Sequence, residues 1–271
     1  MMQNINPKNL EEHNSKSLAV FYENLASKYG DAGYYTHPIG ICRKRKIIKM
    51  IYPQKEDVIC DLGCGEGNLS RDIVKKAKKI YSADISPTRV KKARKKGIDA
   101  VCADVCSTPF KSNYFDKVVC SEVIEHVINP KELIHELNRI LKKGGIAALT
   151  VPFNQKIEKT LLDVPKEDLE HMDYEEIKKK YHVTEDHLHS FSEEGFVKLL
   201  KEAGFTIKQV DYTHKYEPRF KIRLIYSVIS FLKIKFGNCS NIVERICDKI
   251  IFLFYKEKED KGHIVVQASK R

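Results

Sequence analysis

Five short apolar runs alternate with amphipathic stretches between residues 57 and 152, and this alternation limits the chain to few folds. The runs are DVICDLG, KIYSADI, DAVCAD, FDKVVCSEV and IAALTVP. Short strands that are apolar along their whole length are typical of a parallel sheet covered by helices on both faces. The pattern therefore predicts a doubly wound α/β domain.

The stretches between these runs carry apolar residues at helical spacing. We expect helices from Asn68 to about Lys78, from Pro87 to Lys96 and from Pro130 to Lys142, the last one stopped by the glycines of KKGG. Two more helices are predicted before the first strand, in SLAVFYENLASKYG and GICRKRKIIKMI. Ligands of such sheets bind outside the carboxyl ends of the strands, so the residues there should carry the chemistry.

Three glycines, Gly63, Gly65 and Gly67, follow the first predicted strand. A side chain at these positions would keep a ligand away from the backbone and would clash in the tight turn into the next helix. The glycine loop therefore predicts a surface on which a ligand docks.

Length and charge set broader limits. A chain of 271 residues is expected to form one domain with elaborations. Lys and Arg exceed Asp and Glu by 48 − 37 = 11, which favours anionic surroundings without choosing among nucleic acid, phospholipid and acidic substrates. Much of the excess lies in KKAKK and KKARKK, which we interpret as solvated ends of helices.

Cysteine usage and the absence of apolar leaders bear on location. Of the eight cysteines, five lie in or beside apolar runs and none forms a CxxC pair, which is typical of reduced thiols in a cytoplasmic protein. The N-terminal stretch has no apolar segment of a signal peptide, and no run reaches the ~18 apolar residues of a membrane span. We expect a cytoplasmic protein, with the inner face of the membrane as a further location.

The spacing G-x-G-x-G, with Asp61 two residues before it, resembles motif I of class I S-adenosylmethionine-dependent methyltransferases. SEVIEHV, RILKKGGIAALTVP and FSEEGFVKLLKEAGFTIKQVDY extend the resemblance to the methyltransferase type 11 group, which includes the ubiquinone-biosynthesis O-methyltransferases. The likeness covers roughly residues 21–212 and the last strand. It implies a Rossmann-like, mostly parallel sheet of seven strands, with TIKQVDY sixth and GHIVVQAS as the antiparallel seventh.

The resemblance also implies S-adenosylmethionine as the cofactor. Asp84 would accept both ribose hydroxyls, Asp104 would accept the adenine amino group, and the Val105 backbone N–H would face adenine. The other expected cofactor-binding residues are Asp61, Gly63, Cys64, Gly65, Ile85 and Ser121. Asp61 is also expected to hold the glycine loop, and Cys64 also fits a packing role.

Methyl transfer to a hydroxyl needs a base near the end of the fourth strand. The candidates for catalysis are Glu125, His126 and His187, because a histidine can act as a base at neutral pH. Glu122, Glu125 and His126 would share one face of a helical turn and, with His187 or His189, resemble the magnesium site of small-RNA 2′-O-methyltransferases. A direct base, a metal site and a structural role stay open, and Mg²⁺ is not expected.

The chain divides into three predicted parts, which are an N-terminal helical lid at 1–54, a methyltransferase core at 55–216 and 262–271, and an apolar and basic helical insertion at 217–261. Four tyrosines are expected to line the lid, namely Tyr22, Tyr29, Tyr34 and Tyr35. The insertion has three interpretations. It packs on its own domain, forms a homodimer interface or contacts an anionic membrane surface.

These features favour O-methylation of a small or lipid-linked acceptor. The first alternative is a metal-dependent RNA ribose 2′-O-methyltransferase, but the acidic, helical stretch at 163–185 departs from the small-RNA pattern, so nucleic acid is the less favoured partner. The second alternative is a catalytically silent cofactor-binding or interaction module.

Overall fold

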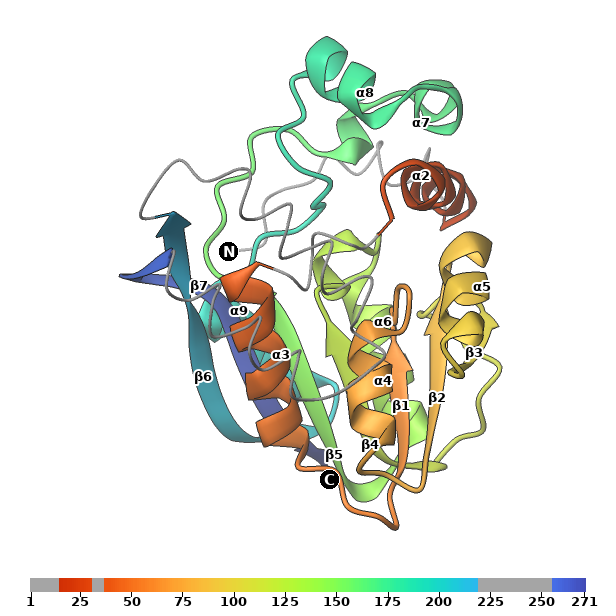
Figure 1. Ribbon diagram of the computed structural model, residues 1–271. Coiled ribbons are helices and arrows are strands. Elements are labelled where there is room, and N and C mark those ends of the chain that lie inside the picture. The colour runs from red at the N-terminus through yellow and green to blue at the C-terminus, as the bar shows by residue number, and fades with distance from the viewer. Residues whose placement is uncertain (1–14, 31–36, 219–254) are drawn as a thin grey trace.

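The computed structural model describes residues 15–30, 37–218 and 255–271, and these residues contain one sheet of seven strands (Figure 1). The strand order is β3-β2-β1-β4-β5-β7-β6. The strands are β1 Val58–Leu62, β2 Lys79–Asp84, β3 Asp99–Cys102, β4 Phe115–Ser121, β5 Leu141–Pro152, β6 Phe205–Pro218 and β7 Tyr255–Lys270. The first five pair in parallel, and β7 runs antiparallel between β5 and β6. The predicted doubly wound, mostly parallel sheet is confirmed.

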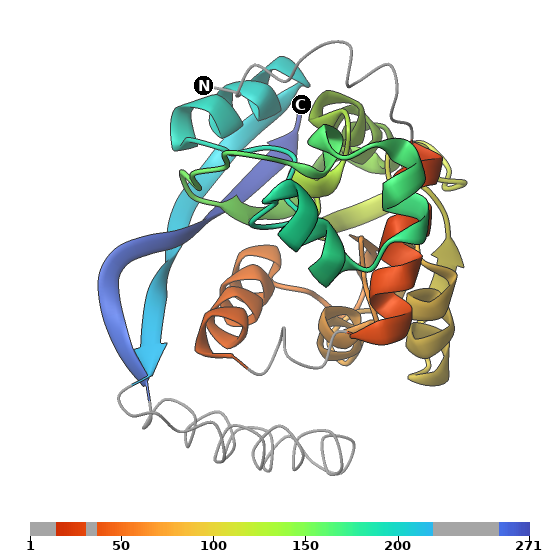
Figure 2. The ribbon, with the colours of Figure 1, turned by 90° about the horizontal axis from the view of Figure 1, so that it is seen from above.

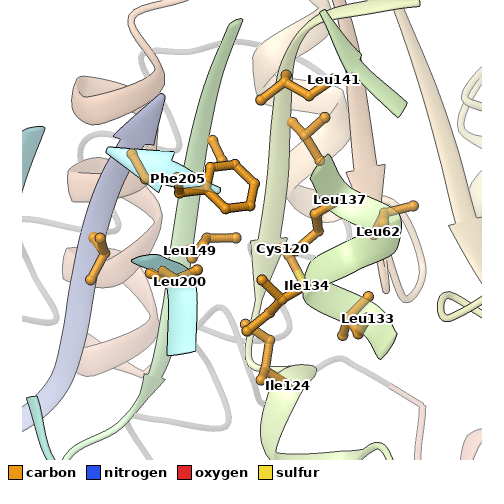
Figure 3. Close-up of a cluster of buried hydrophobic side chains, with 14 of the residues drawn as sticks. Leu62, Cys120, Ile124, Leu133, Ile134, Leu137, Leu141, Leu149, Leu200 and Phe205 are labelled. Atoms are coloured by element: carbon orange, nitrogen blue, oxygen red, sulfur yellow. The ribbon is translucent and has the colours of Figure 1, made fainter. Parts of the chain in front are cut away.

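Helices cover both faces of this sheet. One face carries α3 Pro38–Ile51, α4 Asn68–Val74 and α5 Pro87–Lys95, and the other carries α6 Pro130–Ile140 and α9 Glu193–Glu202. The alternation of side chains along a strand divides the core between the faces. Cys120 packs with Leu137 and Phe205 on the α6 and α9 face (Figure 3). Val118 belongs to the same cluster, whereas Val119 packs toward α3.

The winding reverses beside β1, because the chain moves from β1 to β2 and β3 and then crosses back to β4. The carboxyl ends of β1 and β4 are therefore neighbours at the place where doubly wound sheets bind ligands. Three helices lie beyond these ends, namely α2 Ser15–Lys28, α7 Lys166–His171 and α8 Tyr174–Tyr181 (Figure 1).

The expected lid at 1–54 is divided between two places. Helix α2 packs its Leu18, Phe21 and Tyr22 against η2 Leu161–Asp163, α7 and α8 in a separate apolar cluster. Helix α3 instead packs Ile47 and Ile51 on the sheet face, as part of the core. Tyr34 and Tyr35 lie outside the described residues.

Two helix ends differ from the prediction. Helix α4 ends at Val74, and α6 ends at Ile140, so that Gly144 and Gly145 lie within the span of β5 and do not stop the helix. The register of β4 and β5 jumps from Phe115↔Leu141 to Lys117↔Ile146, which leaves the glycine pair in a bulge. A Cβ on Gly145 would lie 2.9 Å from the Asp116 carbonyl oxygen, so glycine permits this close approach.

The β6–β7 hairpin is longer than the sequence predicts. It pairs from Phe205↔Lys270 to Pro218↔Tyr255 and curves away from the rest of the sheet (Figure 2). The ends of the expected insertion at 217–261 therefore belong to strands, and residues 219–254 lie outside the described part. No helix among the described residues is long and apolar enough to span a membrane.

Candidate active site

The glycine loop begins with two backbone bonds to the neighbouring strand. The N–H groups of Gly63 and Cys64 donate to the Ala83 carbonyl at 2.8 and 3.0 Å. All three loop glycines have positive φ, from 54° to 75°. A Cβ on Gly63 would lie 2.2 Å from Val123 Cγ2, and one on Gly67 would lie 3.1 Å from Ala93 Cβ, so these two are needed for packing. Gly65 is then the loop glycine that best fits a close approach by a ligand.

Two of the predicted acids lie at the ends of β2 and β3. The buried Asp84 carboxylate accepts the Gly65 N–H at 2.8 Å with one oxygen and the Ser86 N–H at 3.0 Å with the other. Asp104 accepts the N–H of Cys106 at 2.9 Å, which holds its half-buried side chain at the start of the turn. The loop and the second strand end are thus fixed to each other through Asp84.

The remaining predicted cofactor residues surround this edge of the sheet. Asp61 is buried and accepts the Ser70 hydroxyl at 2.5 Å, so it holds the start of α4. Burial raises the pKa of Asp61 to about 7, against the opposing effect of that bond. Cys64 and Val105 are buried in the two halves of the core, Ile85 packs beneath α2, and Ser121 shares a hydrogen bond with Thr150 at 3.0 Å.

Glu122 is turned away from the other candidates at the end of β4. Its φ of 57° breaks the expected helical turn, and the short helix η1 begins only at Ile124 and ends at His126. The carboxylate instead pairs with Arg43 at 3.1 Å and His263 at 2.9 Å, and accepts the Thr150 hydroxyl at 2.7 Å. The expected place of Glu122 beside the other three metal-ligand candidates is therefore wrong.

Burial alone would raise the pKa of Glu122, but the positive charge of Arg43 and the bond with His263 hold that pKa well below its usual range. Glu122 is an ionised carboxylate whose two oxygens already have partners. Arg43 and His263 are functional-site residues that sequence reasoning missed, because they come from α3 and β7, far from the motif.

The other three candidates do meet. Ligand atoms of Glu125, His126 and His187 all lie within 4.8 Å of one another. His126 Nε2 is 3.9 Å from Glu125 Oε1, and the two imidazole rings are 4.7 Å apart between centroids. His187 is far from Glu125 in the sequence, but backbone hydrogen bonds hold the two segments together. The N–H groups of Leu188 and His189 donate to the Glu125 carbonyl at 2.7 and 3.2 Å.

The electrostatics distinguish the members of this cluster. Glu125 is fully buried, and neither of its carboxyl oxygens has a hydrogen-bond partner among the described residues. Burial, together with the nearby Glu122 charge, raises the pKa of Glu125 well above its usual range. Burial and the neighbouring His126 lower the pKa of His187 to about 4, and its Nδ1 already contacts the Gln155 side chain. His126 is left as the candidate proton acceptor.

The other ring nitrogen of His126 contacts α2 and the segment between α8 and α9. Its Nδ1 is 3.2 Å from the Asp186 carbonyl oxygen, 3.6 Å from an Asp186 carboxylate oxygen and 3.1 Å from the Tyr22 hydroxyl. A carbonyl oxygen can only accept, so the proton of neutral His126 belongs on Nδ1 and the lone pair on Nε2. His189 is excluded from the cluster, because its Nε2 contacts the Val127 and Ile128 carbonyls.

Comparison with known sequences points to one family. Residues 60–149 match a family model described as a methyltransferase domain. The chain is similar to the uncharacterised protein MJ1123 of Methanocaldococcus jannaschii, with 30% identity over 165 residues, which cover 58% of this chain and 72% of that protein. It is also similar to a ubiquinone biosynthesis O-methyltransferase of Nitrosomonas europaea, with 27% identity over 117 residues, 40% of this chain and 49% of that one.

The extent of these likenesses differs between sequence and fold. The chain spans less than half the length of the first two curated relatives that it matches. The matched residues cover 24% of one relative and 42% of the other. Among solved structures, a SAM-dependent methyltransferase of Thermotoga maritima superposes with a TM-score of 0.60 at 20% identity, over 94% of this chain and all of that one. At that identity the likeness establishes the fold.

Proposed function

Because this chain belongs to the class I S-adenosylmethionine-dependent methyltransferases, we propose that it methylates an oxygen of a small or lipid-linked acceptor. The enzyme class follows from the family, whereas the acceptor and the methylated atom are our inference. Relatives named as both O- and C-methyltransferases match the chain, so the choice of oxygen rests on the site.

The strand ends fit the cofactor of the family. Asp84 and Asp104 are the carboxylates that we propose to accept the ribose hydroxyls and the adenine amino group, and Gly65, whose φ is 54° and whose N–H donates to Asp84, is the glycine proposed to let the cofactor approach the loop backbone. Bound there, S-adenosylmethionine supplies an electrophilic methyl group on a sulfonium. The protein then has to hold the acceptor in line with that methyl and remove its proton.

The observation that carries the proposal is the orientation of His126. Its Nε2 lone pair faces Glu125 and His187 at the end of β4, where it can take the proton of an acceptor hydroxyl as the new C–O bond forms. The Asp186 carboxylate, 3.6 Å from Nδ1, would stabilise the resulting imidazolium. The raised pKa of Glu125, caused by its burial and the nearby Glu122 charge, favours its neutral form, which would add no second negative charge to the pocket.

The test begins with methyl-labelled S-adenosylmethionine and an extract of small molecules and lipids, from which the labelled product is identified. The His126→Gln variant should lose most of the transfer while binding the cofactor as the wild type does, a loss of about 10²–10⁴-fold being typical of a removed base. His171→Gln is the matched control, because His171 is exposed and its Nδ1 lies 2.8 Å from the Glu167 carbonyl oxygen of its own helix. A label on carbon or nitrogen, full activity of His126→Gln, or binding without transfer contradicts the proposal.

A metal-dependent version is the second candidate, because Glu125 offers two buried oxygens beside two imidazoles, and no residue in the described part of the chain bonds to these oxygens. Two histidines and one carboxylate suit a transition metal such as Zn²⁺ or Mn²⁺ better than Mg²⁺, which prefers oxygen ligands. Glu125, His126 and His187 would hold the ion, and it would lower the pKa of a bound acceptor hydroxyl. Loss of turnover with a chelator and recovery with Zn²⁺ or Mn²⁺ would favour this version, whereas chelator-insensitive turnover eliminates it.

The lipid-linked acceptor rests on the sequence of the insertion, whose residues 219–254 lie outside the described part. Its Leu, Ile and Phe residues stand among Lys and Arg, which suits contact with an anionic membrane surface. Co-sedimentation with anionic and neutral vesicles at low and high salt tests this contact. Equal, negligible binding to both vesicles would leave a small soluble acceptor.

A further inference from the structure

Tyr22 reaches the candidate base from outside the sheet domain. It lies on α2, is buried beneath α7 and α8, and places its ring edge-on to the His126 ring with centroids 5.7 Å apart. Its hydroxyl is 3.1 Å from His126 Nδ1 and donates to the Asp186 carbonyl at 3.3 Å. The phenol oxygen, the ring nitrogen and the carbonyl oxygen therefore form a triangle of three mutual contacts.

Only one arrangement of protons satisfies this triangle. If Nδ1 lacked its proton, its lone pair would face the Asp186 carbonyl oxygen at 3.2 Å without a hydrogen between them. With the proton on Nδ1, the imidazole donates toward the two oxygens and the Tyr22 hydroxyl donates to the carbonyl. Both hydrogens are then used, and Nε2 carries the lone pair.

The placement of α2 is itself fixed by the residue next to Tyr22. The Glu23 carboxylate accepts the Ser86 hydroxyl at 2.5 Å and the Thr88 N–H at 3.1 Å, at the start of α5. The Ser86 N–H donates to Asp84, the acid proposed to hold the cofactor ribose. Two adjacent residues of α2 are thus linked to the proposed site, Tyr22 directly to His126 and Glu23 to Asp84 through Ser86.

We propose that Tyr22 is a positioning residue that, with the Asp186 main-chain carbonyl, keeps the proton of His126 on Nδ1 and leaves Nε2 open to the reacting groups. The role deepens the proposed function, because it concerns the same histidine. It holds equally if Nε2 takes a proton or binds a cation, since both need an unprotonated Nε2. Helix α2 would then set the tautomer of His126 through Tyr22, in addition to packing over the site.

The test reads the tautomer directly by ¹⁵N NMR of the full chain labelled on histidine, with the His126 signals assigned by their loss in His126→Gln. The wild type should show a protonated Nδ1 and an unprotonated Nε2 in neutral His126. Tyr22→Phe should give a mixture of both tautomers and lower kcat by about tenfold, with KM for S-adenosylmethionine within about twofold, as is typical when a partner that orients a functional histidine is lost.

Tyr29→Phe is the matched control, because Tyr29 follows the same helix and its hydroxyl donates to Asp173 at 3.4 Å, away from His126. It should leave tautomer and kcat unchanged. A wild-type His126 protonated on Nε2 overturns the proposal without any variant, even if Tyr22→Phe fails to fold. A folded Tyr22→Phe with the wild-type tautomer overturns it too. An Nδ1–H tautomer in a protein that methylates carbon leaves this inference standing and removes only the proposed O-methylation.

Discussion

Arg43 and Glu122 form an ion pair, with Nη1 and Oε2 3.1 Å apart and side chains that are only 4% and 6% exposed. The pair joins α3 to the end of β4, and His263 of β7 contacts both members, with its Nε2 2.9 Å from Glu122 Oε2 and 3.0 Å from Arg43 Nη1. Removing one member of a buried ion pair destabilises the fold, because the remaining charge is left in the interior without a counter-charge and without hydration.

We expect Arg43→Met to lower the free energy of unfolding by about 3–5 kcal/mol, the usual result of leaving a buried charge unpaired. The double variant Arg43→Met with Glu122→Gln should recover most of that loss. Lys46→Met is the control, since Lys46 lies on the same helix and pairs with Asp211 at 2.7 Å with both side chains at least 30% exposed. It should cost about 0–1 kcal/mol. Equal losses in urea denaturation would show that burial does not matter here.

The glycine loop gives a second prediction. Gly65→Val should abolish binding of S-adenosylmethionine in calorimetry while leaving the fold intact, because the side chain would occupy the space of the ligand. Gly97→Val is matched for backbone strain, since Gly97 also has positive φ, 79° against 54°, and no atom lies within 4 Å of its added Cβ. It should bind the cofactor normally. If Gly65→Val bound S-adenosylmethionine as tightly as the wild type, the assignment of the glycine loop as the cofactor-binding motif would be wrong.

Asp84 gives a third prediction. Asp84→Asn should weaken cofactor binding by about 1–3 kcal/mol, the typical loss when hydrogen bonds to a charged group are removed. Asp99→Asn, which changes an exposed partner of Lys79 on the edge strand, should leave binding unchanged. Titration calorimetry compares the two. The same dissociation constant for both variants would place the ribose elsewhere.

Asp61 links stability to pH. Its pKa is about 7 in the folded chain, so between pH ~4 and ~7 the folded state keeps a proton that the unfolded state has lost. The free energy of unfolding should therefore fall as pH rises through this window, by at most ~1.4 kcal/mol per pH unit, and level off above it. Asp61→Asn, which keeps an acceptor for Ser70, should lack that decline. Urea denaturation without cofactor at four pH values measures both, and parallel profiles would contradict the shift.

The sheet was predictable because its strands are apolar on both faces. Val118, Val119 and Cys120 follow one another with no polar break, and neither face of the sheet is exposed to water there. The outer halves of β6 and β7 lack this signal, since THKYEP and YKEKEDKG are polar, and only their mutual pairing makes them strands.

The candidate site was predictable in part. Glu125 and His126 follow from their position after the fourth strand, but the assumption of a continuous helical turn failed at Glu122, whose left-handed φ points its carboxylate to Arg43. The contact between Tyr22 and His126 spans 104 residues, and no local pattern encodes it. Tertiary packing decides such contacts, so they required the structure.

The support that the sheet gives to the β6–β7 hairpin changes along its length. The last pair that ties β7 to β5 is Pro152↔His263, and beyond Gly262 the described part of β7 pairs with β6 alone. At the point where β7 leaves β5, His263 contacts both Glu122 and the Thr213 hydroxyl. A tilt of the outer hairpin against the sheet would therefore be transmitted through His263 to Glu122, the first residue of the segment that leads from β4 to Glu125 and His126.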